Sequence, residues 1–187
     1  MIRKLTTVSI GVIALAATVM AFRFVPGIFQ ATEGKISFRS EAQLELIKAS
    51  SNGLVGLIDT ARKNFTFKVA IRSFEGFNSR TQREHFNENY MQTEKYPEAS
   101  FKGKIIEDID LSHEGVYSVR AKGIMNIHGV EKERIIRAEL TVRNNIITLQ
   151  SNFSVLLSDH NIPIPKVVHQ KLADEIKVEV NTALQPR

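Results

Sequence analysis

Residues 117–127 read Tyr-Ser-Val-Arg-Ala-Lys-Gly-Ile-Met-Asn-Ile, and apolar or small side chains alternate with mostly polar ones along this stretch. A period of two residues is typical of a β-strand with one buried face and one solvent-exposed face. Such strands belong to antiparallel sheets, because strands of a parallel sheet are covered on both faces and read as continuous apolar runs. The stretch therefore predicts an antiparallel, all-β protein.

The same alternation returns on both sides of this stretch. Turn-forming pairs separate the alternating segments, and Asn144-Asn145 has the length and residue type of a two-residue hairpin turn. Long sequential antiparallel strands in one domain predict a closed eight-stranded β-barrel, because closure removes the exposed edges of an open sheet. The predicted strands, eight or nine in number, cover residues 35–41, 43–50, 53–59, 64–73, 100–110, 116–127, 131–143, 146–157 and 175–183.

One segment between the strands departs from this period. Thr81-x-x-Glu84 has the pattern of a helix capping box, and Ser79-x-x-Gln82 offers a competing start. We expect a short helix over about residues 82–91. A second, weaker helical turn is expected after Pro165, just before the last strand.

The N-terminal residues have the parts of a secretory signal peptide. A basic start is followed by the uncharged residues 5–22, and Ala21 supplies the small residue of a cleavage site. We expect a signal peptide over 1–21 with cleavage near Ala21, a connector over 22–33 and one barrel domain over 34–187, in a periplasmic or secreted protein. A retained membrane anchor is the alternative, since about 20 apolar residues span a bilayer.

Composition excludes several classes of function. The 187 residues include no cysteine, so neither disulfides nor thiol chemistry contribute. Removing Arg3 and Lys4 with the signal peptide leaves 23 basic against 20 acidic residues, a net charge of +3, and no run of five like charges occurs, so nucleic acid is not an expected partner. The five histidines form no HExxH or His-x-His pattern, and no nucleophile or phosphate-loop motif is present. No metal, no cofactor and no enzymatic activity are expected.

Small residues interrupt the predicted inward faces, namely Gly103, Ala121, Gly123, Ala138 and Ser151. An eight-stranded barrel is just wide enough to be filled by side chains or to hold one small ligand. Small residues placed opposite one another leave room for an apolar ligand in the lumen. The alternative is that they face bulky partners across a solid interior.

Three stretches resemble a known family. They are residues 73–103, with Lys95-Tyr96-Pro97 and Phe101 after a histidine-bearing helix, residues 123–130, and residues 153–159. Together they resemble the YceI-like family of lipid- or polyisoprenoid-binding proteins, over about residues 34–180. The resemblance implies a lipocalin-like barrel, exported to the bacterial periplasm, whose lumen takes a long isoprenoid or similar amphiphile, and it implies no enzyme. Many family members carry Arg-Asp shortly before the helix histidine, where this chain reads Gln82-Arg83.

The expected function is non-enzymatic binding, transport or storage of such an amphiphile, and the alternative is a solid structural or protein-interaction barrel of the cell envelope. Arg83 and His85 are the candidate contacts for a polar head group at the barrel mouth, where an arginine fork suits phosphate or hydroxyl oxygens. A solvent-exposed helix face is the alternative for both. A homodimer is left open. The residues expected to contact the lipid are Phe67, Val69, Ile71, Phe86, Tyr90, Phe101, Tyr117, Val119, Ala121, Gly123, Met125, Ala138, Leu140, Phe153 and Val155.

Overall fold

The computed structural model describes residues 27–187, so the expected signal peptide lies outside the described residues. Ten strand segments form one sheet in which every neighbouring pair is antiparallel. The segments are β1 (Ile28–Ala31), β2 (Gly34–Glu41), β3 (Leu46–Ser51), β4 (Val55–Asp59), β5 (Asn64–Ala70), β6 (Glu98–Ile105), β7 (Gly115–Ile127), β8 (Val130–Arg143), β9 (Ile146–Leu156) and β10 (Glu175–Pro186).

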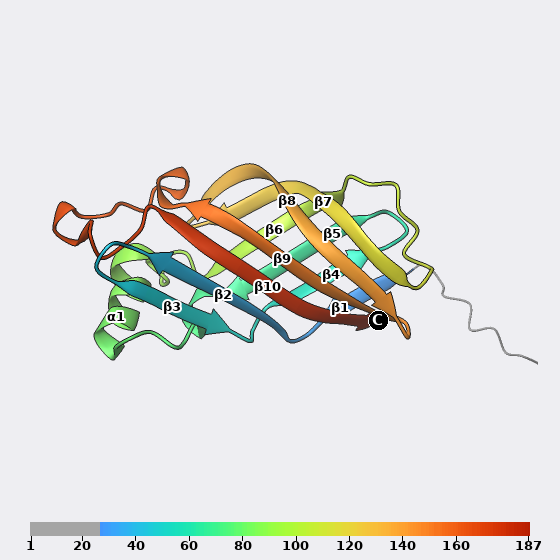
Figure 1. The fold of residues 1–187 in the computed structure, drawn as a ribbon, viewed down its shortest axis with the longest axis horizontal. Helices are drawn as coiled ribbons and strands as arrows, with labels where there is room; N and C mark the ends of the chain where they lie inside the picture. Colours follow the sequence, from blue (N-terminus) through green and yellow to red (C-terminus); the bar gives the residue numbers. More distant parts are fainter. Residues whose placement is uncertain (1–26) are drawn as a thin grey trace, which may run out of the picture.

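The sheet closes on itself through β10. One edge of β10 pairs with β9, and its other edge pairs first with β2 and then, at Gln185 and Pro186, with β1. β1 and β2 are one strand interrupted at Thr32 and Glu33, and β3 and β4, which pair with them, are a second interrupted strand. Counted around the ring there are eight strands, so the predicted closed eight-stranded antiparallel barrel is confirmed (Figure 1).

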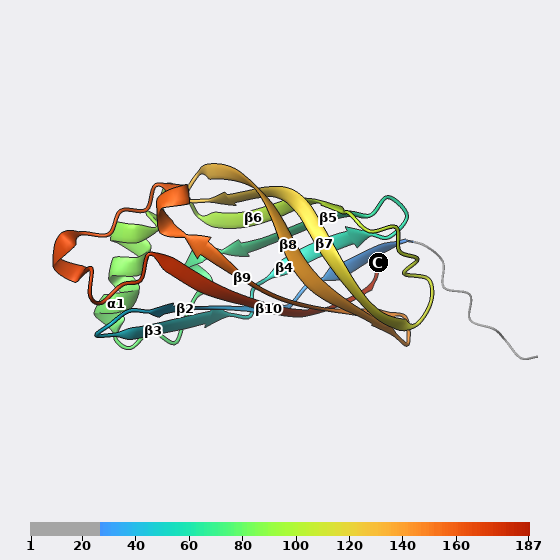
Figure 2. The ribbon, with the colours of Figure 1, turned by 45° about the horizontal axis from the view of Figure 1, so that its top comes forward.

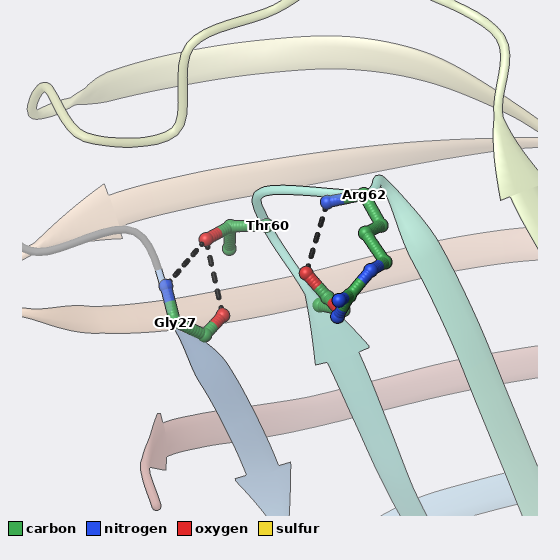
Figure 3. Close-up of polar contacts among 4 residues, drawn as sticks. Gly27, Thr60 and Arg62 are labelled. Carbon is green, nitrogen blue, oxygen red and sulfur yellow. Dashed lines mark hydrogen bonds and ion pairs between the residues drawn. The ribbon is translucent and has the colours of Figure 1, made fainter.

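β1 corrects the expectation that residues 22–33 are only a connector. It is held at its start by Thr60, whose hydroxyl accepts from the Gly27 amide at 3.0 Å and donates to the Gly27 carbonyl at 3.1 Å (Figure 3). Asp59 caps the same turn by accepting from the Arg62 amide at 2.9 Å. This short strand was missed because four residues beside Pro26 and Gly27 are too few to show a period.

The longest strands are joined by tight hairpins. Asn144 and Asn145, with φ of 50° and 60°, form the two-residue turn between β8 and β9 that their sequence predicts. His128 and Gly129, with φ of 53° and 72°, form the equivalent turn between β7 and β8. Positive φ at both central positions gives a turn whose twist matches that of the paired strands, which fixes the register of three long strands.

The chain between β5 and β6 covers one end of the barrel. It contains the 3₁₀ turn η1 (Ile71–Ser73), the helix α1 (Arg80–His85) and the π-helical turn η2 (Phe86–Tyr90). Ser79 is the N-cap, and its hydroxyl accepts from the Gln82 amide at 3.1 Å, so the competing start is the one used and the expected cap at Thr81 is wrong. Figures 1 and 2 both show α1 at the opposite end of the barrel from the C-terminus; we call this the α1 end.

The two remaining 3₁₀ turns also belong to the α1 end. They are η3 (Leu157–His160), which follows β9, and η4 (Lys166–Val168), which confirms the helical turn expected after Pro165. Towards the other end the interior is close-packed around a cluster that includes Leu140, Ile147 and Leu184. The packed cluster forms one floor of the barrel, and the space above it extends to the α1 end.

Candidate functional site

The barrel encloses a cavity of about 270 Å³ with an apolar wall. Leu140 and Leu149 of the packed cluster line it at one end, and Gln82 of α1 and Leu172 after η4 line it at the other. A buried water needs only about 10–15 Å³ of such space, so this is no packing defect. The interior is therefore a chamber and not a solid core.

All of the expected lipid contacts except Tyr117 and Gly123 line this cavity. They come from β5 to β9 and from the segment between β5 and β6, which matches the inward phase read from the alternation. Tyr117 packs on the closed core instead, and its hydroxyl donates to the His113 carbonyl at 2.9 Å. That the lining residues contact a lipid stays a prediction.

Gly123 does not open onto the cavity. It lies opposite Gly103 in the β6–β7 ladder, where the two strands approach closely. A Cβ on Gly123 would lie 2.2 Å from the carbonyl oxygen of Lys102, and a Cβ on Gly103 would lie 2.1 Å from that of Lys122. Both glycines are small so that the backbones can meet, and the interpretation that Gly123 contributes lumen space is wrong.

Four phenylalanines close the side of the chamber near α1. Phe38 of β2, Phe74 and Phe77 of the loop between η1 and α1, and Phe86 of η2 make ring contacts with centroids 5.0 to 6.1 Å apart. Here the outer edge of β3 pairs with no strand, and its backbone bonds to Glu75 through reciprocal 2.8 Å contacts with Ser50, so aromatic side chains cover the gap. Aromatic contacts of this kind are worth roughly 0.5–1.5 kcal/mol each beyond their burial.

Polar side chains of the lining gather at the α1 end. The Gln82 amide donates to Glu45 Oε1 at 2.9 Å and accepts from the Asn78 amide at 3.0 Å, and Asn78 Nδ2 donates to the Leu46 carbonyl at 3.0 Å. These bonds tie α1 to the β2–β3 hairpin. Ser40 of β2 accepts from the Ala173 amide at 2.8 Å, which ties the same hairpin to the segment after η4.

Two polar lining residues of the described chain, Ser100 and Tyr90, make no side-chain hydrogen bond. The Tyr90 hydroxyl is a free donor, and the Tyr90 ring packs beside Ile71, Met91 and Ile162. Burial raises the pKa of the Tyr90 phenol, because the anion would lose its hydration. The group is therefore a neutral donor at the edge of an apolar chamber.

Arg83 and His85, the candidate head-group contacts, do not line the cavity. The Arg83 guanidinium donates to the Arg72 carbonyl at 3.1 Å and lies 3.7 Å from Glu75, while His85 is exposed. His85 thus fits the solvent-exposed alternative, whereas Arg83 is half-buried and bonds to the segment that precedes α1. Their neighbour Gln82 is the helix residue that faces the chamber.

Two buried histidines fasten η3 to the β7–β8 hairpin. His128 Nδ1 donates to the His160 carbonyl at 3.1 Å, and His160 Nδ1 donates to the Val130 carbonyl at 3.2 Å. Burial lowers the pKa of His160, so the ring is neutral at neutral pH. These contacts hold Leu157 and Ile162 against the cavity.

Several lining residues were missed. The alternation at Ile176, Val178 and Val180 gave a signal for β10 that was used only for the fold. Phe74, Phe77 and Leu172 lie in irregular segments, and no local pattern assigns them to a lumen. Across residues 27–187, no group of three or more histidines or carboxylates has a metal-binding arrangement. No helix in this part of the chain is long and apolar enough to cross a membrane.

Residues 7–184 match the family model of the YceI-like domain. A polyisoprenoid binding domain from Saccharophagus degradans, implicated in plant cell wall breakdown, superposes with a TM-score of 0.73 at 13% identity, covering 87% of this chain and 100% of that chain. Burkholderia cenocepacia BcnA superposes with a TM-score of 0.67 at 14% identity, covering 80% of this chain and 95% of that chain. A Campylobacter jejuni YCEI protein superposes with a TM-score of 0.52 at 19% identity, covering 67% of this chain and 75% of that chain. No curated protein matches the chain. At these identities the solved structures show a shared barrel fold.

Proposed function

Since this chain belongs to the YceI-like family, we propose that it binds a long-chain apolar amphiphile, a polyisoprenoid or similar lipid, in the barrel chamber without catalysing a reaction on it. The observation that carries the proposal is the apolar cavity between the packed core and the α1 end. A fold neighbour described as a polyisoprenoid binding domain supports the same class of ligand. Burying each methylene of such a chain contributes about 0.8 kcal/mol, so the lipid is expected to stay bound in water.

The composition of the wall supports binding without catalysis. Within the described residues, the lining contains no carboxylate and no histidine, and its one charged residue, Lys68, directs its ammonium to Glu98 at 2.9 Å. General acid–base or nucleophilic chemistry needs such groups within hydrogen-bond reach of the substrate. The competing hypothesis, a solid structural or interaction barrel, predicts an interior filled by side chains, which the cavity does not support.

The distribution of polar groups sets the direction of the ligand. Tyr90, Gln82 and Ser40 lie at the α1 end of the lining, whereas the opposite end is walled by residues such as Leu140 and Leu149. An amphiphile therefore places its tail over the packed core and its polar head at the α1 end. Among these three polar side chains, Tyr90 is the one that makes no hydrogen bond within the described residues, so its hydroxyl is free to donate to the head group.

Tyr90→Phe is expected to weaken binding of a polyprenol by about fivefold, the equivalent of roughly 1 kcal/mol for one hydrogen bond. The matched probe is a polyisoprenoid hydrocarbon without the hydroxyl, whose affinity is expected to be the same for both proteins. Displacement of a fluorescent lipid measures both affinities. Equal loss for the alcohol and the hydrocarbon would assign Tyr90 to packing alone.

Protein purified from its native envelope is expected to carry a lipid of isoprenoid mass. Native mass spectrometry before and after organic extraction measures it, and added polyprenol should bind again to the extracted protein. Protein that is consistently ligand-free and takes up no polyprenol would favour the hypothesis of a solid structural or interaction barrel.

The same preparation tests the proposed location in the periplasm or outside the cell. The proposal rests on the uncharged residues 5–22 and on Ala21, which lie outside the described residues. Intact mass is expected to show a chain beginning near Phe22 in the soluble fraction. A chain that keeps residues 1–21 and sediments with membranes would identify the segment as an anchor.

A further inference from the structure

The segment after η3 projects beyond the strands at the α1 end (Figures 1 and 2). It turns helically from Lys166 to Leu172, where the Leu172 amide bonds to the Val168 carbonyl at 3.1 Å. Leu172 faces inward and lines the chamber, whereas Val167 is 90% exposed, more than any other large apolar residue described. One short turn thus contributes a lining residue to the cavity on one side and a solvent-exposed apolar side chain on the other.

A second exposed apolar residue lies on the neighbouring hairpin. The Leu44 amide donates to the Gln170 carbonyl at 2.8 Å, so the β2–β3 turn and the η4 segment form one surface. The Leu44 residue is 63% exposed, and Leu46 beside it is also exposed. We call the surface formed by Leu44, Leu46, Lys166, Val167 and Lys171 the mouth face.

The charge on the mouth face is basic. Lys166 and Lys171 are exposed, and within residues 27–187 neither has an ion-pair partner. His169 is exposed between them, and Asp174 is the nearest acidic residue along the chain. Of the nearby carboxylates, Glu41 is paired with Lys177, whereas Glu45 keeps its negative charge because its partner Gln82 is a neutral amide, and Asp174 is exposed. Exposed apolar side chains flanked by lysines are the composition of surfaces that lie in the interface of an anionic bilayer.

We propose that the mouth face docks on the surface of an anionic phospholipid bilayer, so that the polar end of the chamber meets the membrane from which its ligand comes. The proposed lipid function explains why the protein would dock there, so the inference rests on that function. The vesicle experiment below contains no ligand and tests docking independently. Val167 and Leu44 enter the head-group region, and Lys166 and Lys171 meet lipid phosphates. Leu172 connects the docked surface to the cavity, and the lipid tail enters along that side.

The test uses phosphatidylcholine vesicles with and without phosphatidylglycerol, containing no isoprenoid, and measures co-sedimentation. The wild-type protein is expected to bind the anionic vesicles more strongly. Lys166→Gln with Lys171→Gln should weaken binding by about fivefold for each lysine at low ionic strength, and the difference should shrink as salt is added. Val167→Asp should weaken binding by roughly tenfold or more, because it removes a buried apolar group and adds a like charge to that of the lipid.

Val116→Asp is the matched control. Val116 is 66% exposed and lies at the start of β7, where it pairs with Thr141 of β8. This is the end of the barrel away from α1, so its substitution should leave vesicle binding unchanged. Equal binding to both kinds of vesicle would overturn the proposal and would point to a protein partner for this face. Equal loss of binding in Val116→Asp and Val167→Asp would also overturn it. Uptake of polyprenol from detergent is measured separately. If that uptake fails while anionic vesicles still bind, the proposed lipid function falls and the docking surface stands.

Discussion

Gly123→Ala is expected to destabilise the barrel by about 3 kcal/mol or more, at or above the top of the usual range for overpacking. The added Cβ would lie 2.2 Å from the Lys102 carbonyl oxygen and 3.0 Å from the Gly103 Cα, both backbone atoms of the facing strand. Because no flexible side chain can move aside, the β6–β7 ladder must separate. A loss of this size lowers the thermal midpoint of a domain this large by roughly 6–12 °C, which calorimetry measures.

Gly115→Ala is the control on the same strand. A Cβ on Gly115 would meet the Tyr117 ring at 3.4 Å, an ordinary contact with a side chain. Its thermal midpoint is expected to stay close to that of the wild type. If Gly123→Ala were as stable as Gly115→Ala, the close approach of β6 and β7 at this point would be refuted.

The Gly123 position shows where sequence periodicity stops being informative. The alternation places Gly123 in phase with the inward residues Ala121 and Met125, and both of these do line the cavity. Periodicity assigns a face of the sheet, but it contains no information on how closely the next strand approaches. Gly103 is equally small and pairs with Gly123 in register, a relation between residues twenty positions apart that emerges only when β6 and β7 are aligned.

Most of the barrel was predictable, because long strands with one buried face leave a period that survives local exceptions. The hairpin at Asn144 and Asn145 was predictable for a different reason, since asparagine tolerates the positive φ that a two-residue turn requires. β1 was not, because its four residues are a strand only through pairing with β4 and β10. The same limit applies to β5, which ends at Ala70 where η1 begins, three residues earlier than its alternation predicts.

The residues that line the cavity were largely predictable on regular strands and less so on the helix and the irregular segments. Residues on regular strands, such as Val69 and Val155, were assigned to the lumen from their phase. On the short helix Arg83 was chosen for the chemistry of its side chain, but one residue is a rotation of about 100°, and it is the neighbouring Gln82 that lines the chamber. Leu172 and Phe77 reach the cavity from irregular segments, where contacts distant in sequence decide the conformation.

Ala138→Leu is expected to weaken binding of the long-chain lipid by at least about fourfold while leaving the barrel folded. Ala138 lies on β8 opposite Val119, and both line the cavity. The larger side chain enters space that already exists, so the overpacking cost of roughly 1–3 kcal/mol in a close-packed core does not arise. The ligand loses the same space, and affinity for polyprenol should fall by at least the roughly fourfold that one displaced methylene represents. Lipid displacement measures the affinity, and thermal unfolding of ligand-free samples measures the stability, since bound ligand would raise it.

Ala183→Leu makes the same chemical change on the outer face of β10, where the residue is exposed. It should leave both affinity and thermal midpoint unchanged, which separates occupancy of the chamber from any general effect of a leucine on a strand. Ala121→Leu, on β7 beside Ala138, repeats the experiment from a second strand and should also reduce affinity. If both cavity variants unfold while Ala183→Leu does not, the interior is packed and the chamber does not exist in solution. If all three bind polyprenol as the wild type does, the lipid lies outside the barrel. If Ala121→Leu and Ala138→Leu both stay folded and both lose binding, the lipid tail lies inside the chamber, against the wall that β7 and β8 form together.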